Sequence, residues 1–230
     1  MGTYRLLIFD VDDTLVDFRA SQLSALEEIR TRHFPLADAA VFRATYTAVN
    51  AALWSEFNRG TIDQVEIRRR RFTETSQRLG WPVLDWRVLG DEYEAALAEH
   101  SVLFPGVLAT LAALDGRYRM AAVTNGLANV QRPKAVRTGL RRFLDPYVIS
   151  EEEGVAKPAA EIFRRCLERA GTPKEAALMI GDSWESDGAG AAAAKIDFCH
   201  VGGNGDAARP ADLPKPVLEI GAVTELPRWL

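Results

Sequence analysis

The sequence is poor in the residues that build disulfide frameworks and metal clusters, with two cysteines and three histidines among 230 residues. Cys166 and Cys199 lack the close spacing of a zinc site, so both are expected to be buried apolar residues in a reducing compartment. No apolar run is long enough to cross a bilayer, and the chain opens directly into a strand pattern without a signal peptide. These absences predict a cytoplasmic protein with no membrane partner.

An excess of positive charge is also missing. The net charge is -4, which predicts no nucleic-acid partner. The one basic run is Arg68 to Arg71, and we expect it to form a solvated helix face rather than an anion-binding patch. No internal repeats are evident, and the length suits one domain with an insertion or two small domains.

Alternation of strand and helix patterns defines the fold class. Residues 4–11 form a short apolar run that ends in acids, typical of a buried parallel strand. Residues 20–101 contain only helical patterns, with aromatic residues at three- and four-residue spacings. Beyond residue 104, helices alternate with strands expected at 120–123, 147–149, 177–180 and 198–201. We therefore predict an α/β protein with a doubly wound parallel sheet, into which a helical lobe is inserted after the first strand.

Polar residues follow each predicted strand. Ligands of such sheets bind beyond the carboxyl ends of the strands, where the strand order reverses. Acids, a hydroxyl and a lysine would therefore meet in one site. The residues at these ends are Asp10, Asp12, Asp13 and Thr14, then Thr124, Asn125 and Gly126, then Lys157 and Pro158, and finally Gly181, Asp182 and Asp187.

The residue types at these ends suit a phosphate ester and a hard cation. Clustered carboxylates repel one another without a cation, and ligands with oxygen atoms alone suit Mg²⁺. The lysine and threonine would contact phosphoryl oxygens. Gly126 and Gly181 would let the main chain approach the ligand. Asp13 is read as a structural residue.

The four segments 10–14, 123–126, 156–158 and 181–187 resemble, in order, the four motifs of the haloacid dehalogenase-like hydrolase superfamily. The resemblance is to its phosphatase branch. It implies a Rossmann-like core of residues 1–18 and 103–230 with strand order 3-2-1-4-5. The helical block, residues 19–102, is similar to the cap that members of this superfamily carry over the site.

The resemblance also implies roles for individual residues. Asp10 would be the nucleophile and a metal ligand. Asp12 would protonate the leaving oxygen and then activate water, while its main-chain carbonyl binds the metal. Thr124 and Lys157 would hold the phosphoryl group, beside Asn125 and Gly126. For the metal, Asp182 would be a ligand and Asp187 a ligand or the neighbour of one. Two alternatives remain at this point: Thr124 as a helix cap, and Asp187 as the N-cap of the alanine-rich helix.

Within the superfamily the sequence is similar to the pyrimidine 5'-nucleotidases that remove non-standard nucleoside monophosphates. Part of this similarity lies in the helical block, where Trp54 and Phe57 are expected either to stack on a base or to form the core of the lobe. The predicted substrate is thus a small phosphomonoester, with a pyrimidine nucleoside 5'-monophosphate as the first candidate. The core segments that share this similarity are 124–126, 137–140 and 148–152.

Three other functions share parts of this pattern. A sugar-phosphate phosphatase or mutase would share the entire core. A haloacid dehalogenase would share Asp10 but does not need a carboxylate at Asp12. A phospho-acceptor signalling module gathers similar residues, but its acceptor follows a middle strand and it lacks a helical insertion.

Two local features of the main chain are also predicted. The Lys157–Pro158 bond is expected to be cis, since the lysine must turn back toward the phosphate. After the alanine run the family usually has glycine, where this chain has Lys195, so the local geometry is expected to differ there.

Overall fold

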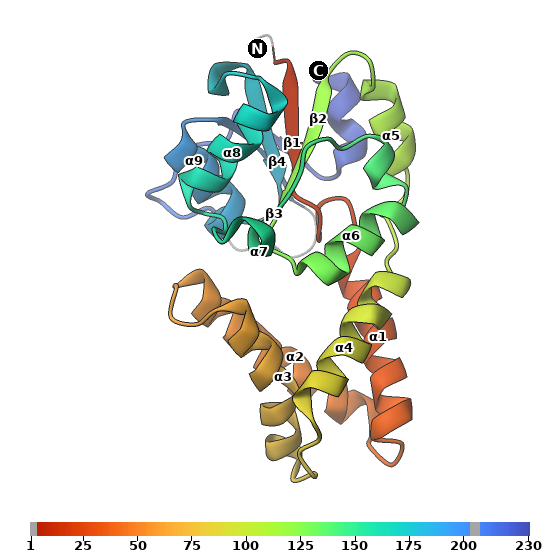
Figure 1. Cartoon of the computed structure of the whole chain (residues 1–230). Coiled ribbons are helices and arrows are strands. Elements are labelled where there is room, and N and C mark those ends of the chain that lie inside the picture. The colour runs from red at the N-terminus through yellow and green to blue at the C-terminus, as the bar shows by residue number, and fades with distance from the viewer. Residues whose placement is uncertain (1–3, 203–207) are drawn as a thin grey trace. The chain divides into compact units, whose positions relative to one another are not determined.

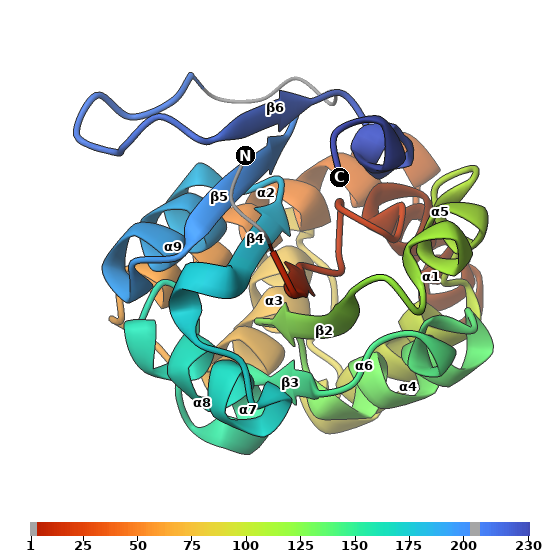
Figure 2. The ribbon, with the colours of Figure 1, turned by 90° about the horizontal axis from the view of Figure 1, so that it is seen from above.

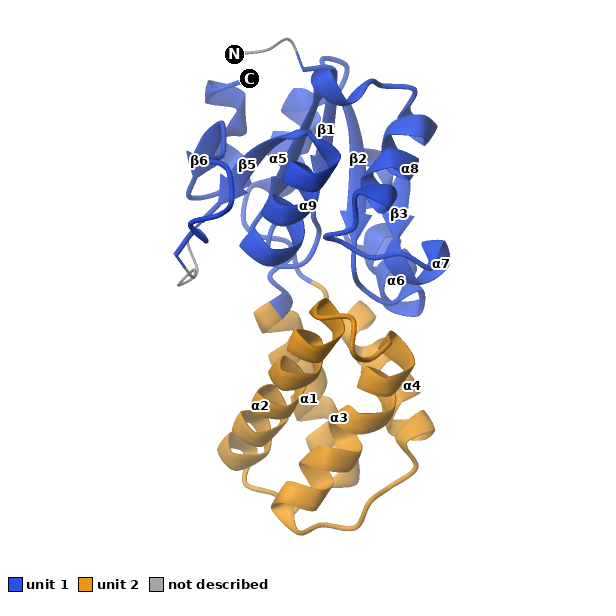
Figure 3. Ribbon diagram, turned by 90° about the vertical axis from the view of Figure 1, so that its left-hand side faces the viewer, with its two compact units in different colours: residues 1–18, 102–230 blue, residues 19–101 orange. Residues whose placement is uncertain are grey.

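The computed structural model describes residues 4–202 and 208–230, which divide into two compact units (Figure 3). One unit comprises residues 1–18 and 102–230 and contains the sheet. The other comprises residues 19–101 and is helical. We call them the sheet unit and the helical unit.

The sheet unit is built on six parallel strands in the order β3-β2-β1-β4-β5-β6 (Figures 1 and 2). This confirms the predicted Rossmann-like α/β class and the order of its first five strands. The sixth strand, at the edge beside β5, was not predicted. The strands are β1 (Leu6–Phe9), β2 (Arg119–Thr124), β3 (Tyr147–Ile149), β4 (Ala177–Gly181), β5 (Asp197–Val201) and β6 (Leu218–Ile220).

The central strand β1 is buried along its whole length because helices cover both faces of the sheet. Leu7 and Phe9 belong to the core on one face, beneath α5 and α6. Leu6 and Ile8 belong to the core on the other face, beneath α8 and α9. The helices of this unit are α5 (Val107–Leu114), α6 (Ala128–Arg137), α7 (Ser150–Glu153), α8 (Ala160–Ala170) and α9 (Ala189–Ala194).

The helical unit consists of α1 (Phe18–His33), whose first residue belongs to the sheet unit, α2 (Ala39–Asn58), α3 (Gln64–Leu79) and α4 (Trp86–Glu99). Aspartates cap the last three helices, because a carboxylate accepts hydrogen bonds from the free N–H groups of a first turn. The rings of Tyr46, Phe72 and Tyr93 pack together at the centre, with centroids 5.1–5.4 Å apart. Within the described ranges, no helix is long and apolar enough to span a lipid bilayer.

The basic run on α3 differs from the prediction of a solvated face. Arg69 lies on the surface beside Glu66, but Arg71 is buried and forms an ion pair with the buried Glu94 of α4. Arg68 also reaches Glu94, with its Nε 3.0 Å from Oε1. Successive residues of a helix point in different directions, so a run of four arginines cannot share one face.

Lys195 ends α9 in the left-handed conformation, with φ 57°. Glycine adopts this conformation without steric cost, whereas a side chain is strained there. The lysine therefore keeps the backbone turn that a glycine favours, and the expected change of geometry is absent. The Lys157–Pro158 bond is cis, as predicted, and so is Asp145–Pro146.

Candidate active site

The predicted site residues lie at the carboxyl ends of the central strands. Asp10 directly follows β1, and its main-chain N–H donates to Ile180 of β4 at 2.9 Å. Thr124 is the last residue of β2, and Asp182 directly follows β4. Because β1 and β4 lie side by side where the strand order reverses, these ends form the edge at which such sheets bind ligands.

Lys157 joins two buried carboxylates at this edge. Its Nζ lies 2.5 Å from Oδ1 of Asp10 and 2.7 Å from Oδ1 of Asp187. Asn125 holds the lysine in place: its Oδ1 accepts the N–H of Lys157, and its Nδ2 donates to the Lys157 carbonyl, both at 2.8 Å. The Asn125 side chain, predicted to bind substrate, thus fixes the loop that carries the lysine.

Asp187 is fully buried within a π-helical turn, Trp184–Gly188, that precedes α9. Its Oδ2 accepts the N–H of Ser183 at 3.1 Å. The caps of this turn and of α9 are Ser183 and Gly188, so the alternative reading of Asp187 as an N-cap is wrong. A Cβ on Gly181 would lie 2.2 Å from Oδ2 of Asp187, so the glycine makes room for the carboxylate.

Three carboxylates meet beside the lysine. Each of Asp10, Asp182 and Asp187 offers an oxygen, and these oxygens lie within 4.8 Å of one another. Burial raises the pKa of Asp10 to about 7, against the attraction of Lys157. Burial and the nearby Asp10 charge raise the pKa of Asp182 to about 8. One ammonium therefore does not compensate the three carboxylates, and the arrangement fits a divalent cation with oxygen ligands.

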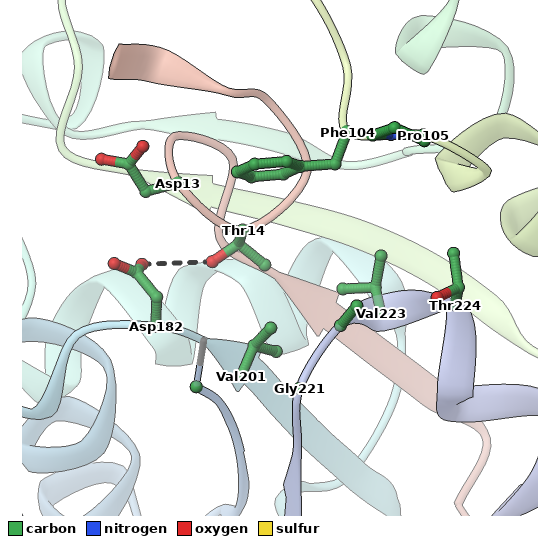
Figure 4. A pocket seen from close by; sticks show the side chains of 11 residues that line it. Asp13, Thr14, Phe104, Pro105, Asp182, Val201, Gly221, Val223 and Thr224 are labelled. Carbon is green, nitrogen blue, oxygen red and sulfur yellow. Dashed lines mark hydrogen bonds between the residues drawn. The ribbon is translucent and has the colours of Figure 1, made fainter. Parts of the chain in front are cut away.

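Asp182 has two further partners, Thr14 in the segment after β1 and His200 of β5. Thr14 donates to Oδ1 of Asp182 at 3.2 Å (Figure 4). The Nε2 of His200 lies 3.0 Å from the Asp182 carbonyl, and the His200 ring stacks on Trp184 with centroids 4.0 Å apart. Thr14 and Asp182 line a cavity of about 320 Å³ with Asp13 and the Phe104 ring, which leaves room for several water molecules next to the carboxylate.

The Asp12 side chain contacts a helix of the sheet unit. Its two carboxylate oxygens contact Gln131 and Lys134 of α6. Neither α6 residue was predicted to belong to the site. The sequence does contain a signal for Gln131 and Lys134. They are three residues apart, and so lie on one face of a helix that begins just after the Thr124 motif.

The segment after β2 is arranged by short-range contacts. The buried hydroxyl of Thr124 accepts the N–H of Gly126 at 3.2 Å, so it stabilises this turn. A Cβ on Gly126 would lie 2.2 Å from Nε2 of Gln131. As at Gly181, the glycine leaves space for another site side chain.

Trp54 and Phe57 lie on α2 in the helical unit. Their rings meet edge to face, with centroids 5.4 Å apart and planes at 83°. Both pack, partly buried, against the small apolar cluster of Val49, Leu53 and Ile67. These contacts give both rings a packing role within the helical unit.

Comparison with known proteins places the chain in a class. The model of the haloacid dehalogenase-like hydrolase family matches residues 4–195, and the chain belongs to this family. The pyrimidine 5'-nucleotidase YjjG of Escherichia coli K12 is 34% identical over 194 residues, which are 84% of each chain. The pyrimidine 5'-nucleotidase PynA of Streptococcus pneumoniae is 32% identical over 84% of this chain and 82% of its own.

A solved structure supports the same placement. The crystal structure of the HAD-hydrolase YfnB from Bacillus subtilis, bound to magnesium, superposes with a TM-score of 0.89. Its sequence is 30% identical, and the match covers 99% of this chain and 98% of that one.

Proposed function

We propose that this hydrolase cleaves phosphomonoesters through an aspartyl-phosphate on Asp10. The observation that carries the proposal is the buried Asp10 carboxylate at the end of β1, held 2.5 Å from the Lys157 ammonium. A carboxylate fixed in this way is a nucleophile with a defined direction of attack. The ammonium beside it would also contact the oxygens of an entering phosphoryl group.

The reaction consists of two displacements at phosphorus. A carboxylate oxygen of Asp10 attacks the phosphorus, the ester P–O bond breaks, and protonated Asp12 gives its proton to the leaving oxygen. Water then attacks the phosphorus and passes a proton to the Asp12 carboxylate, while the bond to Asp10 breaks. Phosphate leaves, and both aspartates return to their starting states.

Mg²⁺ is the proposed cofactor, held by the carboxylates of Asp10 and Asp182 and by the Asp12 carbonyl, with Asp187 beside them. When bound, it would neutralise charge on the phosphoryl oxygens. Thr124 and Lys157 would hold those oxygens from the protein side. The cavity beside Asp182 gives space for water ligands, which Mg²⁺ usually keeps.

For the substrate we propose a pyrimidine nucleoside 5'-monophosphate. The support is the similarity to two pyrimidine 5'-nucleotidases over more than four fifths of this chain, a share that must include most of the helical unit. We propose the helical unit as the cap that contacts the leaving group. Trp54, which is only partly buried in its apolar cluster, is the residue proposed to stack on a base, worth roughly 1–3 kcal/mol.

The test compares hydrolysis of UMP, dUMP and dTMP with that of AMP, GMP, glucose 6-phosphate and glyceraldehyde 3-phosphate in the presence of Mg²⁺. A preference for the pyrimidine nucleotides of about tenfold to a hundredfold in kcat/KM is expected. Trp54→Leu should reduce this preference, while Trp86→Leu, also in the helical unit, serves as the matched control. Equal turnover of a sugar phosphate would reject the substrate and leave the phosphatase reaction intact.

A further inference from the structure

A lysine that no sequence motif singles out lies buried against Asp12. Lys134 is 0% exposed, and its Nζ contacts Oδ1 of Asp12. The ring of Phe18 covers the ammonium, with its centroid 5.6 Å from Nζ. A buried ammonium is costly unless it is paired, so this lysine is placed here for its carboxylate partner.

The second oxygen of Asp12 is held by another residue of the same helix. Nε2 of Gln131 donates to Oδ2 at 2.7 Å. The hydroxyl of Tyr147 donates to Oε1 of Gln131 at 3.2 Å, which orients the amide with its N–H groups toward Asp12. Gln131 and Tyr147 are both buried, whereas the Asp12 side chain is 25% exposed.

Gly126 is part of this arrangement. A Cβ at this position would lie 2.2 Å from Nε2 and 2.8 Å from Cδ of Gln131. The amide of Gln131 therefore reaches Asp12 through the space that the missing side chain leaves. A glycine is therefore required at position 126 so that Gln131 can reach Asp12, rather than to let the main chain approach the ligand.

From these contacts we propose that Lys134 and Gln131 are positioning residues for Asp12. Holding both oxygens fixes the rotation of the carboxylate about its Cβ–Cγ bond. Each oxygen keeps a further lone pair, which can carry the proton given to the leaving oxygen and later accept one from the attacking water. This inference rests on the proposed function, in which Asp12 transfers the proton.

The test uses Lys134→Met and Gln131→Leu, which keep the side-chain size and remove the hydrogen bonds. First-turnover rates are measured by rapid quench with UMP, whose leaving alkoxide needs a proton, and with p-nitrophenyl phosphate, whose leaving group does not. The first turnover of UMP should fall about tenfold to a hundredfold, as expected for an impaired general acid. Release of p-nitrophenol should stay within about threefold, and KM should change little.

Two further measurements separate positioning from a general structural role. In an Asp12→Asn background, Lys134→Met should cause no additional loss, because its effect acts through Asp12. Gly126→Ala should resemble Gln131→Leu, since the added Cβ displaces the amide. Val136→Ala is the control: it lies on the same helix, α6, and its side chain is exposed.

Equal losses with both substrates, or a full additional loss in the Asp12→Asn background, would overturn the inference while the phosphatase reaction stands. A wild-type protein that hydrolyses neither substrate would instead reject the proposed function. If Lys134→Met lowers the folded fraction, Gln131→Leu carries the same comparison, because it leaves every charge in place.

Discussion

Lys157 and Asp10 form a buried ion pair at the end of β1, with Nζ 2.5 Å from Oδ1. The same ammonium contacts Asp187, so one cation is shared by two carboxylates. Burial lowers the pKa of Lys157, but the two carboxylates outweigh this effect and raise it above its ordinary value. The lysine thus remains charged and holds the Asp10 carboxylate in one orientation.

Replacing the proposed nucleophile should remove almost all turnover. Asp10→Asn keeps the shape of the side chain but removes the attacking oxygen anion, so we expect kcat to fall by at least about three orders of magnitude. The measurement is steady-state hydrolysis of UMP with Mg²⁺, with circular dichroism to show that the variant is folded. Near-normal turnover by this variant would refute the aspartyl-phosphate route.

Asp12→Asn should act on the chemical step rather than on binding. A general acid and base contributes roughly two to four orders of magnitude, so kcat for UMP should fall by such a factor. The affinity for inorganic phosphate, measured by calorimetry, should change only a few-fold. An unchanged kcat with this poor leaving group contradicts the role given to Asp12.

Stability without metal should depend on pH. The pKa values of Asp10 and Asp182, about 7 and about 8 in the folded chain, lie above their ordinary value of 3.8. Their contribution to stability is therefore complete below pH 3.8 and is lost as the pH rises through 7 and 8. In EDTA, Tm should be lower at pH 8.5 than at pH 5.5, and added Mg²⁺ should raise Tm more at pH 8.5.

The Asp182→Asn variant is the control for this effect, because it removes one of the two titrating groups. Its Tm in EDTA should vary less between the two pH values than that of the wild type. A Mg²⁺-induced rise in Tm that is equal at both pH values argues against a cation at these carboxylates.

The stability of the helical unit should depend on the buried carboxylate of Glu94. Glu94 is 1% exposed and pairs with Arg71 and Arg68. Glu94→Ala leaves the Arg71 guanidinium buried without its carboxylate, so the free energy of unfolding should fall by about 3–5 kcal/mol. Urea unfolding followed by circular dichroism measures this loss. Glu66→Ala, which breaks the surface pair with Arg69, should change little, and equal effects of the two variants would contradict the prediction.

Much of the sheet could be predicted because its strands are short apolar runs with polar residues at their ends. β3 lies at 147–149 as expected, and β4 extends the prediction by only one residue. β6 was missed because Leu218–Ile220 is a three-residue strand just after a proline-rich segment. Its place at the edge is determined by pairing with β5, which is a long-range contact.

The site residues that belong to the four motifs could be predicted from the sequence. The residues that contact them and hold them in place could not. Lys134 resembles any helical lysine until the fold brings it against Asp12. Arg71 was misread for a related reason, since its partner Glu94 is 23 residues away and only the packing of α3 on α4 buries both. Local patterns report the direction of a side chain along its own helix, whereas charge pairing depends on a second element.

The chain leaves and re-enters the sheet unit at two points that are already tied together. Val16 forms an antiparallel bridge with Leu103, and the N–H of Phe104 donates to the Leu15 carbonyl at 3.0 Å. Residues 19–101 therefore form a long insertion whose ends are held together, and its length adds little to the entropic cost of closing it. We expect such a junction to let the helical unit be exchanged, or replaced by a short Gly/Ser turn, without altering the order of the sheet. The proposed selectivity of the helical unit and the proposed chemistry of the sheet unit are then carried by separate parts of the chain.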